Sequence, residues 1–131
     1  CPTSKQLYNR TSSEALTIDN MDPTLIVNTE TPLNTPRTGV IGSVNNKLMY
    51  RLYANGVLTD DYFCKTTVPV LPSVSEEWNA INGGIIEVTT IKNGTSAYKH
   101  TIVLKNVVLK KGNSDFKLGD RYAYGDLITS N

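Results

Sequence analysis

The sequence predicts an all-β fold, a single β-sandwich-like domain of about eight or nine mostly antiparallel strands. Short runs of alternating apolar and polar residues recur along the chain, which is typical of strands with one buried face. Dipeptides that favour tight turns, Asn55-Gly56 and Asn93-Gly94 among them, separate these runs at short spacing. Helical periodicity is absent, apart from at most one short helical turn near 75-80. A closed barrel would give the same pattern, so both architectures stay open.

The expected strands follow one another along the chain. Residues 14–18 and 25–29 are the first candidates, and a loop with Pro32 and Pro36 follows, because proline lacks the amide donor that a central strand needs. The full set of expected strands is 14–18, 25–29, 38–43, 47–54, 57–64, 85–92, 96–105, 107–111 and 122–129. The polar N-terminal segment 1-30 is expected to cover a sheet edge, either in this chain or in a neighbour.

Two hairpins are expected from their turn residues. Lys47 to Ala54 alternates, and Asn55-Gly56 supplies the two residues that a type I′ turn needs at positive φ. Val57 to Cys64 is therefore expected to return beside it as a strand. Asn93-Gly94 is expected to join the strands on either side of it in the same way.

One stretch, Ser73 to Asn79, is expected to be helical. Ser75 could cap it, and Glu76 and Glu77 would lie in the first turn, where carboxylates suit the helix dipole. The prediction is a single helical turn in an otherwise all-β chain.

Length and charge narrow the function. A chain of 131 residues has the size of one domain, and no linker divides 1-131 into two. The net charge of +1 argues against a nucleic-acid partner, because binding a phosphate backbone requires a concentrated basic field. No apolar run approaches the roughly 20 residues that cross a bilayer as a helix. Membrane association is therefore expected only through a lipid anchor.

The two cysteines allow three interpretations. In the first, Cys1 and Cys64 form a disulfide in an oxidising compartment, and the long loop that it closes would be worth about 4 kcal/mol on the chain-entropy model. In the second, Cys1 is the lipid-bearing residue of a processed bacterial lipoprotein and Cys64 is a buried thiol. In the third, the chain simply happens to start at Cys1. The first two exclude each other, because one sulfur cannot carry both bonds.

No set of residues matches a catalytic or metal-binding pattern. His100 is the only histidine, and no nucleophile elbow accompanies it. Glu76 and Glu77 could serve a glycosidase beside Trp78, but adjacent residues point in different directions. The scattered aspartates match no calcium loop. The chain is therefore expected not to be an enzyme and to bind no metal or cofactor.

The aromatic residues suggest a sugar-binding alternative. A platform for stacking a glycan could be formed by Trp78 with the tyrosines Tyr50, Tyr53, Tyr62, Tyr98, Tyr122 and Tyr124. Tyr122 and Tyr124 are expected on one strand face, which is the geometry that stacking needs. Core packing and ordinary surface tyrosines would explain the same residues. Trp78 must be exposed for the platform to work, so a buried Trp78 would argue against it.

The order of several segments resembles that of a known family. The stretches that carry it are Thr35 to Thr38, Leu48 to Asn55 (LMYRLYAN), Tyr62 to Cys64, Ser75 to Gly84 (SEEWNAINGG), Ile85 to Thr90, Tyr98 to Val107 (YKHTIVLKNV) and Lys111 to Asn113. They resemble a group of uncharacterised outer-membrane or surface lipoproteins of Bacteroidota, chiefly flavobacteria. The resemblance covers most of the chain from about residue 30 onward, and none of its stretches is a catalytic motif.

This resemblance implies an address and a role. In the family, a lipid-bearing cysteine precedes a later Cys-Pro step, and Cys1-Pro2 resembles that later step. It therefore implies a disulfide between Cys1 and Cys64, although nothing upstream of Cys1 is present. The function expected is that of a non-enzymatic accessory or structural subunit, exported to the outer membrane or cell surface, with a protein partner in a membrane-associated assembly. Glycan binding is the alternative.

Overall fold

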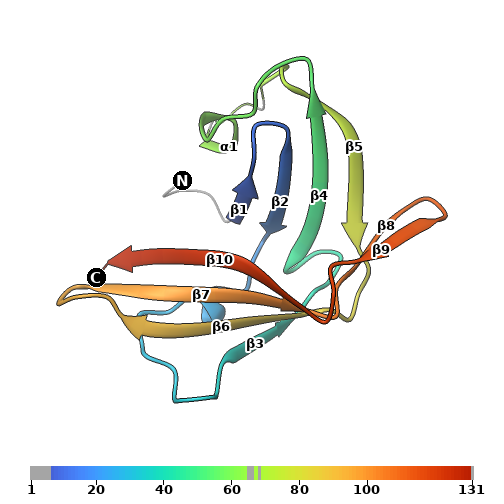
Figure 1. Cartoon of the computed structure of the whole chain (residues 1–131). Helices are drawn as coiled ribbons and strands as arrows, with labels where there is room; N and C mark the ends of the chain where they lie inside the picture. The colour runs from blue at the N-terminus through green and yellow to red at the C-terminus, as the bar shows by residue number, and fades with distance from the viewer. Residues whose placement is uncertain (1–6, 65–66, 68, 131) are drawn as a thin grey trace.

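The protein folds into two antiparallel β-sheets (Figure 1), which confirms the all-β, sandwich-like prediction. The computed structural model describes residues 7–64, 67 and 69–130. The strands in them are β1 (Leu7–Arg10), β2 (Glu14–Asp19), β3 (Arg37–Val40), β4 (Lys47–Ala54), β5 (Ser73–Ala80), β6 (Ile85–Lys92), β7 (Ala97–Lys105), β8 (Val108–Lys111), β9 (Ser114–Lys117) and β10 (Arg121–Ser130). Two short helices accompany them, a 3-10 turn η1 (Pro23–Leu25) and α1 (Asp61–Cys64).

The two sheets differ in size and direction. Sheet A has six strands in the order β1-β2-β4-β5-β8-β9, and sheet B has four in the order β10-β7-β6-β3. The strands of sheet A run across those of sheet B, and the β8–β9 hairpin projects beyond the packed sheets (Figure 1). Sheet B therefore covers only part of the inner face of sheet A.

The inner faces of the two sheets share one core. Ile18 and Leu48 of sheet A, with Ile86 and Leu104 of sheet B, are at most 1% exposed and belong to a single cluster. Their alternation along the strands follows from the period of two in an extended chain. Burial of each aliphatic side chain of this kind stabilises the fold by roughly 1.5–3 kcal/mol.

The outer face of sheet A has a smaller core of its own. Ala15 and Tyr53 are buried there with Leu58, which lies in the loop after β4. Tyr62 and Phe63 of α1 pack against this cluster. The loop and α1 thus cover the side of sheet A that faces away from sheet B.

Several expected elements are confirmed. The strands expected at 47–54 and 85–92 have the predicted bounds in β4 and β6. Asn93-Gly94 joins β6 to β7 as an antiparallel hairpin, as its sequence predicts. These segments combine strong alternation with turn chemistry that agrees with it.

The prediction of a helical turn near 75-80 is wrong. Ser73–Ala80 is strand β5, and it pairs with β4 so that Trp78 lies opposite Tyr50 and Glu76 opposite Leu52. The capping signal at Ser75 is local, whereas pairing places alternate side chains of the whole stretch against a neighbouring strand. Tertiary pairing outweighed the local preference.

The prediction of a hairpin at Asn55-Gly56 is also wrong. Both residues have positive φ, 61° and 153°, but β4 has β2 and β5 as its neighbours. The chain after the turn runs through a loop into α1 instead of returning as a strand at 57–64. Leu58 explains this path, because its side chain is fully buried against the outer face of sheet A.

The strand expected at 25–29 is wrong for a different reason. Arg37 binds the backbone carbonyl groups of this segment. Its Nη1 donates to Leu25 O at 3.2 Å, and its Nη2 donates to Val27 O and Thr29 O. A guanidinium thus satisfies acceptors that a neighbouring strand would otherwise take. Asp22 caps η1 at the start of the segment through the Thr24 amide.

Besides β5, two strands were not expected, and one was assigned to the wrong sheet. β1 and β9 are both four-residue strands, too short for an alternating pattern to be recognised. Residues 107–111 were expected to continue the strand at 96–105, but β8 belongs to sheet A and β7 to sheet B. Asn106 has a φ of 55°, and this left-handed residue turns the chain from one sheet to the other.

Candidate functional site

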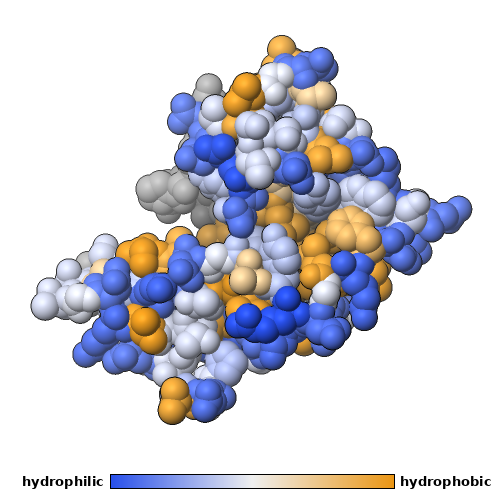
Figure 2. Space-filling model, in the orientation of Figure 1, coloured by the Kyte–Doolittle hydropathy of each residue, from blue (hydrophilic) through white to orange (hydrophobic). Residues whose placement is uncertain are grey.

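The two sheets form a groove where their end strands face each other. β1 ends sheet A and β10 ends sheet B, so each has one edge without a strand beside it among the described residues. In Figure 1, β1 lies over the middle of β10. Figure 2 shows apolar surface gathered in the hollow where the sheets meet. We call this space the inter-sheet groove.

Asn9 spans the groove from β1 to β10. Its Nδ2 donates a 2.8 Å hydrogen bond to the carbonyl oxygen of Tyr124. A β-bulge adjoins this contact, since the register of β10 against β7 shifts between Ala123 and Gly125. Gly125 has a φ of 152°, which residues with a side chain rarely adopt. The glycine thus permits the bulge beside the Asn9 contact.

On one side of Asn9, both free strand edges border the groove. This edge half encloses about 300 Å³ and is lined by Leu7, Tyr8, Asn9, Ile102, Tyr124, Gly125, Asp126 and Leu127. Its floor is apolar, since the Ile102 and Tyr124 side chains are almost fully buried. The edge half therefore combines backbone hydrogen-bonding groups at its rim with an apolar floor.

On the other side of Asn9, aromatic rings border the groove. This aromatic half encloses about 380 Å³, and its lining includes Tyr50, Phe116 and Tyr122 with the carboxylate of Glu14. Asn9 lines both halves, so they form one continuous groove. The aromatic half exists because sheet B leaves this part of sheet A uncovered.

The strand register places the polar and aromatic side chains of sheet A in two adjacent rows. Leu52 lies between Glu14 on one side and Glu76 on the other. In the next row of the same face, Tyr50 lies opposite Trp78. Each carboxylate thus has an aromatic ring close to it on the same face of the sheet.

Phe116 from β9 joins the two aromatic residues. Its ring is edge-on to Tyr50, with centroids 6.1 Å apart, and edge-on to Trp78 at 5.1 Å. Edge-to-face pairs of this kind are favoured over face-to-face stacks. The three rings form a cluster with differing orientations instead of one flat strip.

The two carboxylates have different partners. The Tyr50 hydroxyl donates a hydrogen bond to Glu14 Oε2, whereas Lys111 Nζ lies 2.8 Å from Glu76 Oε1. Desolvation, with the hydrogen bond and charge of Glu14, raises the pKa of Tyr50 to about 12. Lys111 lowers the pKa of the Glu76 carboxyl below its usual value. Glu76 is therefore ionised at neutral pH beside the ring of Trp78.

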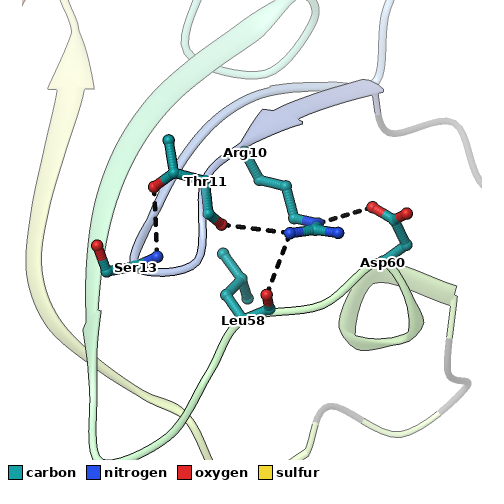
Figure 3. A network of polar contacts seen from close by, with 5 residues as sticks. All are labelled: Arg10, Thr11, Ser13, Leu58 and Asp60. Carbon is teal, nitrogen blue, oxygen red and sulfur yellow. Dashed lines mark hydrogen bonds and ion pairs between the residues drawn. The ribbon is translucent and has the colours of Figure 1, made fainter.

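Arg10 fixes the β1–β2 hairpin at the rim of the aromatic half (Figure 3). Its Nε lies 2.7 Å from Asp60 Oδ1, and its Nη1 donates to Leu58 O and Thr11 O. Arg10 lowers the pKa of the Asp60 carboxyl. The positive charge of Arg10 is thereby matched by Asp60, which lies outside the groove lining.

The predicted glycan-binding residues are in three different environments. Tyr122 lines the aromatic half of the groove. Tyr124 is only 4% exposed, and its hydroxyl donates to Leu16 O at 2.8 Å, so its ring face is not available to a ligand. Trp78 is half-buried and packs edge-on against Phe116. Of the three, Tyr122 alone lines the aromatic half, whereas Tyr124 forms part of the buried floor of the edge half.

The residues considered for catalysis do not come together. His100 is fully buried in the core, between Thr90 and Thr129. Glu76 and Glu77 are adjacent on β5 and therefore point to opposite faces, and Glu77 pairs with Arg51 at 2.6 Å. Across the described residues, no group of histidine, cysteine and acidic side chains could hold a metal ion.

The cysteine predictions stay untested. Cys1 lies outside the described residues, and Cys64 is the last residue of α1, with a side chain that is not described. No helix in the described part of the chain is long and apolar enough to cross a membrane.

Comparison of the chain with protein-family models, curated proteins and solved structures found no match. Its function must therefore be inferred from the groove. Sequence reasoning missed Asn9, Glu14 and Phe116, which lie in short strands or at a strand end. Tyr50 is one of the tyrosines considered for the aromatic platform, and the alternation of β4 places it on one face with Leu48 and Leu52.

Proposed function

We propose that this chain is a non-enzymatic binding domain that holds an extended segment of a partner protein along β10. The observation that carries the proposal is the free edge of β10 beside the apolar floor of the inter-sheet groove. Free strand edges readily pair with an added strand. The sequence resemblance supports a place for this domain in an outer-membrane or cell-surface assembly, with Cys1 either bearing a lipid anchor or forming a disulfide with Cys64.

The geometry of β10 identifies the backbone groups that an added strand would use. Ser130 O accepts a hydrogen bond from Asn28, so the backbone of Ser130 points away from β7. In an antiparallel ladder, alternate residues point the same way. Ile128 and Asp126 therefore also direct their amide and carbonyl groups outward.

The free part of this edge has the length of a short strand. Asn9 binds Tyr124 O at one end and Asn28 binds Ser130 O at the other. Between them, residues 125–129 make no outward backbone hydrogen bond to a described group. Five residues span roughly 17 Å as a strand, close to the mean strand length. A partner segment of this length could pair with β10 and bury alternate side chains on Ile102 and Leu127.

A displayed library of random ten-residue peptides tests this proposal. We expect the chain to enrich peptides with alternating apolar residues, because only one face of an added strand would meet the groove floor. Ile128→Pro removes one outward amide without removing a bond to β7, and it should abolish binding. Ile128→Ala, which keeps the amide, is the matched control and should bind normally.

Two results would count against the proposal. Enrichment of no peptide would exclude strand addition, and equal binding by Ile128→Pro and Ile128→Ala would place the peptide elsewhere. Far-UV circular dichroism of both variants shows whether the sheets persist. Detergent extraction from the source organism, with Ile128→Pro as the control bait, would then identify the natural partner by mass spectrometry.

Glycan binding is the alternative. Because Tyr124 is buried, a sugar would have to use Tyr122 with Tyr50 and Phe116 in the aromatic half. The β10 edge plays no part in that mode. The glycan alternative would be favoured if the unaltered chain and Ile128→Pro bound oligosaccharides equally well and the chain bound no peptide.

A further inference from the structure

Trp78, Glu76 and Lys111 form a cation-binding arrangement within the protein itself. Lys111 Nζ lies 2.8 Å from Glu76 Oε1 and 6.0 Å from the centroid of the Trp78 ring. The ammonium group thus gains both an ion pair and a cation–π contact. The aromatic ring and the carboxylate belong to the inner face of β5, two residues apart.

Tyr50 on β4 and Glu14 on β2 form a second pair of aromatic ring and carboxylate on the same face of the sheet. Tyr50 lies opposite Trp78, and Glu14 lies in the same cross-strand row as Glu76 with Leu52 between them. The Tyr50 hydroxyl holds the Glu14 carboxylate in place. Both Tyr50 and Glu14 line the aromatic half, so an entering group would meet the ring and the carboxylate together.

The Tyr50–Glu14 pair differs from the Trp78–Glu76 pair in that no described lysine or arginine accompanies it. Among the described residues, no lysine or arginine forms an ion pair with Glu14. Arg10 lines the same half, but its guanidinium is paired with Asp60. Lys111, the cation of the neighbouring Trp78–Glu76 arrangement, is paired with Glu76. The aromatic half thus presents a half-buried negative charge to whatever enters it.

We infer that the aromatic half binds a lysine or arginine side chain of the partner segment, between the Tyr50 and Tyr122 rings and the Glu14 carboxylate. The inference rests on the proposed function, because the segment along β10 delivers this side chain past Asn9. Charge complementarity selects a basic residue: a cation neutralises Glu14 and contacts the ring faces. A neutral sugar would leave the charge of Glu14 unmatched.

The effect of Glu14 and Glu76 on Tyr50 supports this choice. Both carboxylates act electrostatically to raise the pKa of Tyr50, after desolvation and the Glu14 hydrogen bond. Their negative potential therefore reaches the ring that would contact the cation. In a partly desolvated groove this potential is screened less than on an open surface.

A double-mutant cycle between chain and peptide tests the inference. The probe is the tightest peptide from the displayed library, and the same peptide with its basic residue changed to glutamine. Against the unaltered chain, we expect this change to weaken binding about tenfold, the usual effect of losing a hydrogen bond to a charged group. Against Glu14→Gln, the same change should cost less than about twofold.

Glu30→Gln is the matched control, since Glu30 is exposed and lines neither half of the groove. It should keep the tenfold difference between the two peptides. Tyr50→Phe removes only the hydroxyl that orients Glu14, and it should reduce the difference without abolishing it. Thermal unfolding by circular dichroism checks that each variant is folded.

The outcomes separate this inference from the proposed function. Peptides that pair with β10 but carry no fixed basic residue, or a cycle without coupling to Glu14, would overturn the inference and leave strand addition intact. A library that yields no peptide would overturn both. Binding of a neutral oligosaccharide in the aromatic half, lost in Tyr122→Ala, would replace both with glycan recognition.

Discussion

His100 Nε2 lies 2.7 Å from Thr129 Oγ1, and this contact joins the buried part of β7 to the end of β10. The Thr129 hydroxyl donates its proton to Asn28 Oδ1, so its oxygen accepts the proton of Nε2. His100 Nδ1 then accepts from the Thr90 hydroxyl at 2.7 Å, and Thr90 Oγ1 accepts from Arg37. The network thus holds His100 neutral, with its proton on Nε2.

Acid should therefore destabilise the protein through His100. Burial, and then the charge of Arg37, lowers the pKa of His100 below its ordinary value. Between the folded and unfolded pKa values the unfolded chain binds the extra proton, so stability is lost as pH falls below about 6.5. We expect a loss of up to about 1.4 kcal/mol between pH 7.5 and 5.5, measured by urea unfolding.

His100→Gln provides the control for this pH effect, because His100 is the only histidine in the chain. Glutamine offers a donor NH2 group and an acceptor oxygen and does not titrate, so the variant should lose much less stability over the same pH range. A pH dependence equal to that of the unaltered protein would show that other groups cause it.

The sequence predicted the parts of the fold in which local pattern and tertiary packing agree. β6 and β7 alternate strongly and are joined by Asn93-Gly94, so turn chemistry and burial both favour the hairpin. β5 was missed because its local signal, a serine followed by two glutamates, favours a helix start. Its pairing with β4 depends on residues about 25 positions away, which no local pattern contains.

The groove was predictable only in part, for the same reason. Tyr122 was recognised as a candidate binding residue, and it does line the groove. Glu14 and Phe116 come from distant strands, and their approach to Tyr50 depends on strand order and on the β8–β9 hairpin. Tyr124 was expected to share the face of Tyr122, and both do face inward. The burial of Tyr124 against Leu16 depends on how the two sheets pack.

The ion pair between Arg10 and Asp60 should contribute little to stability (Figure 3). The Asp60 side chain is 68% exposed, and an exposed ion pair contributes little because water and salt screen the attraction. We expect Asp60→Asn to lower the urea midpoint only slightly, with a smaller effect in high salt. Asp115→Asn is the control, because Asp115 is exposed and forms no ion pair with a described residue. A large fall in the urea midpoint would instead indicate that Arg10 holds the hairpin in place.

Gly125 should be sensitive to substitution because of its backbone. An added Cβ would meet no atom within 4 Å, so Gly125→Ala would act only through its φ of 152°. We expect a loss of about 1–2 kcal/mol in unfolding free energy. Gly83→Ala is the matched control, with a φ of 114°, equally open space and a position outside the groove lining. Both variants should lose stability, but only Gly125→Ala should also weaken peptide binding.

The buried Tyr124 should make the stability of the protein depend on pH in the alkaline range. Burial raises the pKa of Tyr124 well above its usual value near 10, so the folded protein keeps a proton that the unfolded chain releases. Stability is then lost as pH rises above about 10. Tyr124→Phe should cost about 1–2 kcal/mol at pH 7, because Leu16 O loses its donor in a buried position.

The same variant should be less sensitive to alkali than the unaltered protein, since it lacks this titrating group. Urea unfolding at pH 7 and pH 10.5 measures both effects. The phenylalanine ring keeps the floor of the edge half, so the affinity for the selected peptide should change less than about twofold. If Tyr124→Phe unfolds at the same urea concentration as the unaltered protein at pH 7, the hydrogen bond to Leu16 contributes nothing to stability.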